Sequence, residues 1–154
     1  MSQLSCEYSS IKNELETQGF YVCRSYGVSM QPLFKTHRDV IVLESPKREL
    51  KKYDVVLYGV GDDEYFLHRI IKVTPDHYLI RGDNTFVIER VKKESVIGVL
   101  ISYTRNGKKH SVSDFSYKLY SRVWNFIYPF RFILRKSRIF LGRVYRKLFK
   151  GGKK

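Results

Sequence analysis

The sequence YFLHRIIKVTPDHYLIRGDN, Tyr65 to Asn84, gives the strongest indication of the architecture of this chain. Two short runs rich in β-branched and aromatic residues, Tyr65–Val73 and His77–Arg81, are separated by Thr-Pro-Asp. The second run leads into Gly-Asp-Asn, a common tight-turn sequence. Short apolar runs between turn-forming residues are typical of β-strands. The stretch therefore predicts two strands of a sheet and a tight turn.

Similar runs lie on both sides of this stretch, without helical patterns between them. Asn106-Gly107, between ISYTR and KKHSV, is a strong signal for a two-residue β-hairpin. Leu4, Tyr8, Ile11 and Leu15 recur at helical spacing and predict an N-terminal helix that Gly19 ends. The other predicted strands are Phe20–Arg24, Asp39–Glu44, Asp54–Val60 and Val96–Arg105. We expect a mainly β fold.

The last forty residues have a different composition. Apolar and aromatic side chains recur there every three or four residues with Arg and Lys between them, and Pro129 should break or kink the helix near its middle. Residues 111–154 hold twelve Lys or Arg and one acid, a net charge of +11, whereas residues 1–110 have a net charge of +3. We expect a basic amphipathic tail that either lies on an anionic membrane surface through residues 115–154 or packs back on the domain.

The overall composition suits one globular domain. The chain has 154 residues, of which 43% are hydrophobic, which excludes a disordered polyelectrolyte. The predicted organisation is an N-terminal helix (1–19), a β-domain (20–112) and the helical tail (113–154). The longest uncharged run of the tail, Val123–Phe130, is too short to span a bilayer, and the N-terminus has no apolar signal or anchor segment. We expect a cytoplasmic protein, at most peripheral at the inner face of the membrane.

Ser29 is the first candidate for chemistry. It lies in GVSMQPLF, Gly27 to Phe34, between a glycine-led bend and a proline. A serine hydroxyl is a poor nucleophile at neutral pH and needs a base within about 3 Å. His68 is the candidate base, because imidazole can accept a proton near neutral pH. In a strand, its side chain would point the same way as Phe66 and Ile70.

A carboxylate on the second ring nitrogen of such a histidine would fix its tautomer and stabilise the imidazolium. Glu89 and Asp83 are the two candidates for this carboxylate. Lys72 shares the predicted strand face of His68 and is a minor alternative base.

Four stretches between Tyr26 and Leu100 resemble, in order, the motifs of the signal peptidase I and repressor-type serine peptidase clan. GVSMQP, residues 27–32, is similar to its G-x-S-M-x-P nucleophile motif. KYDVVL, residues 52–57, resembles its G-D-hydrophobic-V strand, with Tyr53 in place of the glycine. LHRII, residues 67–71, resembles the general-base motif, where most bacterial members have Lys-Arg and the endoplasmic-reticulum type has His-Arg. GDN, residues 82–84, matches the turn of that His-type branch.

The resemblance implies a signal-peptidase/repressor-type β-domain and a serine endopeptidase, a hydrolase that cleaves a signal, leader or propeptide without a cofactor. Ser29 would be the nucleophile and His68 the general base. Glu89 stands where the family has an aspartate, so we favour Glu89 for orienting His68. Asp83 would then shape the turn through an Asx-type bond to local backbone.

The same resemblance implies further roles around the nucleophile. The backbone N–H of Ser29 would be an oxyanion donor, and Gly27 would be a hinge that provides no side-chain donor. Met30 and Pro32 would contact the substrate, whose residues just before the scissile bond would be small.

Other functions have less support in the sequence. His37, His77 and His110 lack metal-ligand spacing, so no metal site is predicted. Cys6 and Cys23 are expected to be reduced thiols. A self-cleaving repressor is disfavoured because the chain contains no alanine for an Ala-Gly site. The alternative to an enzyme is a non-enzymatic binding module whose tail binds a membrane or nucleic acid. Nucleic acid is the less favoured ligand, because the sequence contains no pattern of a known nucleic-acid-binding fold.

Overall fold

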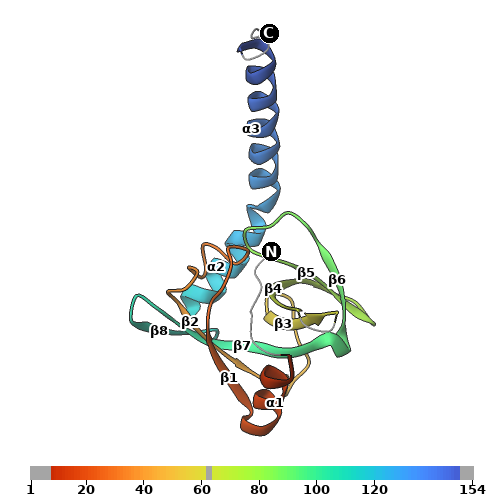
Figure 1. Cartoon of the computed structure of the whole chain (residues 1–154), viewed down its shortest axis with the longest axis vertical. Coiled ribbons are helices and arrows are strands. Elements are labelled where there is room, and N and C mark those ends of the chain that lie inside the picture. The colour runs from red at the N-terminus through yellow and green to blue at the C-terminus, as the bar shows by residue number, and fades with distance from the viewer. Residues whose placement is uncertain (1–7, 62–63, 150–154) are drawn as a thin grey trace.

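An eight-stranded antiparallel sheet forms the body of the molecule (Figure 1). The computed structural model describes residues 8–61 and 64–149. The strands follow the spatial order β1-β2-β7-β3-β4-β5-β6, and β8 pairs with β7. Their bounds are β1 Phe20–Arg24, β2 Val40–Glu44, β3 Val55–Val60, β4 Glu64–Val73, β5 His77–Arg81, β6 Glu89–Lys92, β7 Val96–Arg105 and β8 Lys108–Ser111. The prediction of a mainly β chain is confirmed.

Each strand predicted from the sequence is present, within one residue at its ends, and the Asn106-Gly107 turn joins β7 to β8. Both turn residues have positive φ, at 51° and 76°, as this hairpin turn requires. The sequence did not predict β6. Its four residues, Glu-Arg-Val-Lys, include only one apolar side chain, Val91, so the segment lacks the pattern of a strand. Pairing with β5 holds it in the sheet.

The pairing of β3 with β4 determines which side chains share a face of the sheet. Val56 lies opposite His68, and Tyr58 lies opposite Phe66. Residues opposite each other in an antiparallel pair point to the same face, and diagonal neighbours remain within reach of long side chains. Tyr58 and His68 therefore lie on one face, as diagonal neighbours.

Apolar side chains cover both faces of the sheet. One buried cluster brings Leu57 and Leu67 together with Ile11 and Leu15 of α1 (Tyr8–Gln18) and with Met30. A second cluster occupies the opposite face, and its members include Val56, Tyr58, Phe66, Ile70 and Ile80. The predicted N-terminal helix is therefore packed into the core. Gly19 ends it with a positive φ of 77°, and its N–H binds the Leu15 carbonyl at 3.1 Å, while Leu4 lies outside the described residues.

Two helices follow the sheet, α2 (Phe115–Phe126) and α3 (Tyr128–Phe149). They are separated at Ile127, and Pro129 lies in the first turn of α3, where the missing N–H of proline is tolerated. The predicted break near Pro129 is thus confirmed. Among the described residues, none of the helices has both the length and the apolar composition that crossing a bilayer requires.

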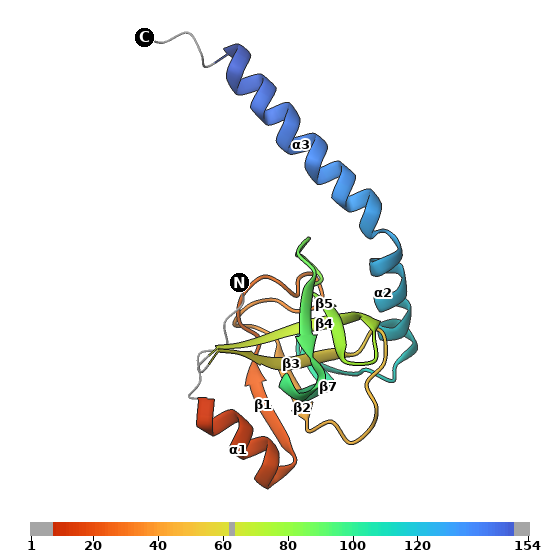
Figure 2. The same cartoon turned by 90° about the vertical axis from the view of Figure 1, so that its right-hand side faces the viewer.

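The two helices of the tail have different surroundings. α2 lies against the sheet, whereas α3 projects away from it (Figure 2). Tyr117 and Ser121 of α2 are buried, and Trp124 donates a hydrogen bond from Nε1 to the Asp83 carbonyl at 2.8 Å. The sequence left two alternatives for the whole tail, and packing on the domain holds for its first helix. The predicted apolar positions Leu141, Val144, Tyr145 and Leu148 have side chains outside the described residues.

Candidate active site

The loop that carries Ser29 connects β1 to β2 and is tied together at its base. The Ser25 N–H binds the Asp39 carbonyl and the His37 N–H binds the Ser25 carbonyl, both at 2.8 Å. The fully buried Asp39 carboxylate accepts a hydrogen bond from the Lys35 N–H at 2.8 Å. Gly27 has a φ of 77°, a conformation that glycine adopts without strain. These bonds hold the turn that carries Ser29 at the edge of the core.

The Gly-Asp-Asn turn lies directly against this loop. The Asn84 N–H donates to the Ser29 carbonyl at 2.7 Å, and its side-chain Nδ2 donates to the Val28 carbonyl at 3.2 Å. A Cβ added at Gly82 would lie only 2.7 Å from the same Ser29 carbonyl oxygen. The turn needs glycine here because the two backbones approach too closely for any side chain. The turn thus fixes the position of Ser29.

The hydroxyl and the imidazole proposed for catalysis meet in space. Ser29 Oγ lies 3.0 Å from His68 Nε2, although the two residues are 39 positions apart in sequence. Each residue is only 4% exposed. This is the distance at which a histidine can take the proton of a serine hydroxyl.

Glu89 contacts the other nitrogen of the same ring. Its Oε1 lies 3.0 Å from His68 Nδ1, and its Oε2 accepts a hydrogen bond from the Tyr58 hydroxyl at 2.6 Å. The Tyr58 oxygen is in turn 2.9 Å from His68 Nδ1. Glu89, Tyr58 and His68 therefore form a closed triangle of polar contacts.

This triangle assigns the tautomer of His68. Burial favours the neutral acid of Glu89, but the hydrogen bonds from His68 and Tyr58 outweigh it and lower the pKa of the carboxyl. An ionised carboxylate can only accept hydrogen bonds, and the single hydroxyl hydrogen of Tyr58 is already donated in the hydrogen bond to Glu89. Nδ1 must then carry the ring hydrogen. Nε2 is left with its lone pair facing the Ser29 hydroxyl, as a general base requires.

Tyr58 stays a protonated donor in this network. Burial and the adjacent Glu89 carboxylate both raise the pKa of its hydroxyl. Sequence reasoning missed Tyr58, because its role depends on the strand register that places it diagonally to His68. The two-residue spacing of Phe66 and His68 indicated their shared face, but nothing in the sequence pairs that face with β3.

Asp83 makes neither of the contacts expected from the sequence, which were with His68 or with local backbone. Its carboxylate binds Arg69 rather than His68: Arg69 Nε donates to Oδ1 and Nη2 to Oδ2, each at 2.8 Å. The Tyr120 hydroxyl donates to Oδ2 at 3.0 Å. The expected Asx-type bond to local backbone is replaced by these long-range contacts. The reason is that Arg69 is fully buried and requires a counterion within reach.

Arg69 joins the turn to α2. Burial is the largest single influence and opposes its charge, but the attraction and hydrogen bonds of Asp83, with the nearby Tyr117 and Tyr120, together outweigh burial and raise the pKa of the guanidinium. Nη1 donates to the Tyr53 carbonyl at 2.9 Å and to Ser121 Oγ of α2 at 2.8 Å. The Arg of the His-Arg motif thus holds the Gly-Asp-Asn turn and the second helix on one side of the strand, while His68 faces Ser29 on the other.

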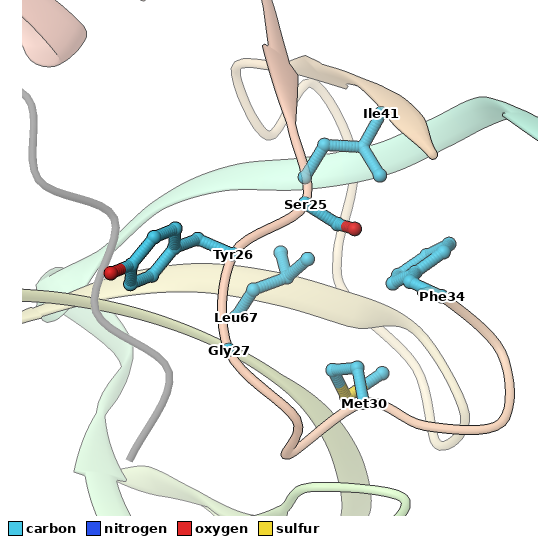
Figure 3. Close-up of a pocket in the computed structure, with 7 residues that line it drawn as sticks. All are labelled: Ser25, Tyr26, Gly27, Met30, Phe34, Ile41 and Leu67. Carbon is cyan, nitrogen blue, oxygen red and sulfur yellow. The ribbon is translucent and has the colours of Figure 1, made fainter. Parts of the chain in front are cut away.

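Two cavities lie along the loop that carries Ser29, and Ser29 itself lines the larger one. The smaller, about 10 Å³, is surrounded by side chains that include Met30, Phe34 and Leu67, beneath the backbone from Ser25 to Gly27 (Figure 3). The larger, about 290 Å³, contains both Ser29 and His68 and is mostly apolar. Its other lining residues are Val60, Glu64, Phe66, Thr85, Val87 and Glu89.

The remaining predicted site residues lie as follows. Met30 is buried and lines the smaller cavity. Pro32, which follows a cis peptide bond, lines neither of these two cavities. Lys72 is exposed, beyond a register shift in β4 that follows Ile70, and it is His68 that contacts Ser29. The structure therefore favours His68 over Lys72 as the base.

The described side chains contain no group of three or more His, Cys, Asp or Glu arranged to hold a metal ion. Cys23 is half-buried in β1, and Cys6 lies outside the described residues, so the state of these thiols stays a prediction. No protein-family model matches the chain, and no curated protein is significantly similar to it.

Proposed function

We propose that this chain is a serine endopeptidase with a signal peptidase I-like, Ser-His catalytic β-domain, which cleaves a peptide bond in a signal, leader or propeptide. The observation that carries the proposal is the 3.0 Å approach of Ser29 Oγ to His68 Nε2, with Glu89 on the opposite ring nitrogen. The two residues come from separate motifs and meet in the geometry that activates a serine. Their order and sequence neighbours resemble those of the His-type branch.

The proposed reaction follows from the positions of the protons. His68 Nε2 takes the hydroxyl proton of Ser29 as Oγ attacks the carbonyl carbon of the substrate, and the carbonyl electron pair moves to its oxygen. Glu89 stabilises the imidazolium through Nδ1–H. The imidazolium then protonates the leaving amine as the C–N bond breaks, which leaves an acyl-enzyme. Water, activated by the same imidazole, releases the acid and restores Ser29.

The negative charge that develops on the substrate oxygen needs fixed donors. The backbone N–H of Ser29 is the proposed donor, and one such donor typically contributes about 3 kcal/mol. Gly27 would allow the substrate backbone to approach the nucleophile turn closely. The bonds of Asn84 to the Ser29 and Val28 carbonyls support this role, because they orient the peptide units on both sides of the nucleophile.

The two cavities along the loop that carries Ser29 are the proposed sites for substrate side chains. The cavity lined by Met30 has room for about one water-sized probe, so a methyl group fits it far better than a large side chain. The larger cavity beside Ser29 and His68 would receive an apolar side chain. The substrate would lie extended beside the strands, as in β-augmentation.

The test is cleavage of a peptide library that contains small residues at every position. Ser29→Ala should abolish turnover while leaving the fold intact, and His68→Ala should cause a similar loss. Lys72→Ala is the matched control, because this exposed residue of the same strand should retain most of the activity. Equal cleavage by wild type and Ser29→Ala would refute the proposal and favour a binding module on a peptidase-like scaffold. Loss with Lys72→Ala but not with His68→Ala would overturn the choice of base.

A further inference from the structure

α3 carries an exposed apolar stripe that no described residue covers. Phe130, Ile133, Leu134 and Phe140 are each 60–65% exposed. At about 100° per residue, they fall within one arc of about 120° on the helix surface. The helix projects away from the sheet (Figure 2). Phe132 and Arg135, which contact Phe86 of the domain, lie on the opposite side of the helix from the stripe. A large contiguous apolar surface of this kind marks an interaction site.

Basic side chains border the stripe on both edges. By the same helical geometry, Lys136 lies along one edge and Arg138 lies along the other. Lys136 and Arg138 are exposed, and among the described residues neither forms an ion pair with a carboxylate. Asp114 is the last acidic residue in the sequence. Lys136 and Arg138 therefore give the edges of the stripe a positive charge that no described carboxylate pairs with.

The first turn of α3 is fixed to the domain, and this holds the helix in its projecting orientation. Arg131 Nη2 donates to the Asp83 carbonyl at 3.1 Å, and its guanidinium lies 3.8 Å from the ring centre of Trp124. Arg81 binds Asn125 Oδ1 at 2.8 Å and lies over the ring of Tyr128. These contacts clamp both ends of the α2–α3 junction. The direction of α3 is set by the same turn that positions Ser29.

We propose that α3 binds the surface of a membrane rich in anionic lipids, with its apolar stripe at the acyl boundary and its basic edges among the headgroups. Charge complementarity selects this occupant. A nucleic acid would match the positive charge but would leave four large apolar side chains in water. A second copy of the chain would bring two uncompensated basic helices together. An anionic bilayer satisfies both the stripe and its edges.

The geometry of α3 suits this role. Its 22 residues make a helix of about 33 Å, long enough to lie along the interface over several turns. Because the first turn of α3 is bound to the turn that contains Asp83, a membrane-bound α3 would hold the proposed peptidase site at a defined distance from the lipid surface. The proposal concerns the place of the enzyme, and it stands whether or not Ser29 is catalytic.

The experiment is sedimentation of the full chain with two kinds of vesicle, phosphatidylcholine alone and phosphatidylcholine mixed with phosphatidylglycerol. The wild type should bind the mixed vesicles at least about tenfold more tightly. Phe140→Glu, which puts a charge into the stripe, should weaken this binding about tenfold or more. Phe115→Glu is the matched control, since Phe115 is 77% exposed at the start of α2, outside the stripe, and its variant should bind like wild type.

A second pair of variants separates charge placement from net charge. Arg138→Glu should weaken binding to the mixed vesicles about tenfold or more, because it reverses a charge at the edge of the stripe. Lys108→Glu changes the net charge equally at the start of β8 and should have at most a small effect. Ser29→Ala should bind vesicles like wild type.

Several results would overturn the proposal. Equal affinity for neutral and anionic vesicles would do so, as would equal losses in the Phe140 and Phe115 variants. Tighter binding to single-stranded DNA than to the mixed vesicles, unchanged by Phe140→Glu, would identify a nucleic-acid surface instead.

Discussion

Adding one methyl group at Gly82 tests the contact between the two turns that build the site. In Gly82→Ala, the new Cβ would lie 2.7 Å from the Ser29 carbonyl oxygen, 3.0 Å from Thr85 Cγ2 and 3.1 Å from His68 Cδ2. Carbon–oxygen contacts normally begin at about 3.3 Å, so the backbones would have to separate by roughly 0.6 Å. The atom that must move belongs to Ser29, the proposed nucleophile, whose carbonyl oxygen also accepts a hydrogen bond from the Asn84 N–H.

The size of the effect follows from this displacement. Overpacking in a close-packed region costs about 1–3 kcal/mol, less than the stability of a typical domain, so the variant should fold. A misplacement of about 1 Å costs about 100-fold in rate. A shift of roughly 0.6 Å between Ser29 and His68 should therefore lower kcat/KM at least about tenfold. If Ser29 and His68 act as proposed, the loss should be in kcat, because the new methyl group contacts both residues.

The assay compares thermal unfolding and peptide cleavage for wild type, Gly82→Ala and a control. Gly98→Ala in β7 is a suitable control, because its Cβ would have ordinary contacts of 3.4–3.7 Å with Leu15, Leu57 and Leu43. It should keep the wild-type kcat/KM. If Gly82→Ala unfolded at the wild-type temperature and kept wild-type kcat/KM, the close approach of the two turns would be refuted.

The remaining predictions concern the polar groups around the site. Tyr58→Phe should lower kcat and cost about 1.5–3 kcal/mol of stability, because Glu89 loses a donor, whereas Tyr78→Phe in the same core cluster should leave kcat unchanged; equal kcat values for the two variants would contradict this. The folded-state pKa of Glu89 is lowered, so its stabilisation is present above the unfolded-state pKa and is lost as pH falls through the folded-state value. The difference in melting temperature between wild type and Glu89→Gln should accordingly shrink as pH is lowered from about 7 to about 3, and a difference independent of pH would be inconsistent with an ionised Glu89. Asp83→Asn should lower the free energy of unfolding in chemical denaturation by about 3–5 kcal/mol, because it leaves the buried Arg69 without a counterion. The double variant Arg69→Met/Asp83→Leu should recover most of this loss of stability. A double variant less stable than Asp83→Asn would argue against this origin of the loss.

Local sequence was sufficient for most of the sheet. The strand runs around His68, the Asn106-Gly107 turn and the break near Pro129 depend on residues close in sequence, and each is present in the structure. β6 could not be predicted, because its place comes from pairing with β5 and only Val91 has a buried apolar side chain. The tail had two open alternatives because α2 and α3 have the same amphipathic pattern. Only contacts across the fold distinguish them.

The sequence by itself identified Ser29, His68 and Glu89 as a candidate set, because residue type and order are properties of the chain. It left Glu89 and Asp83 as alternatives, since both carboxylates follow His68 at plausible spacing. The tertiary structure decided between them. Arg69 is buried and pairs with Asp83 as its counterion, whereas Glu89 contacts His68. Tyr58 lies in the site because the register of β3 against β4 places it diagonally to His68. Hydrogen bonds act over about 3 Å, so which groups form them depends on how distant segments pack, and spacing along the chain does not give that distance.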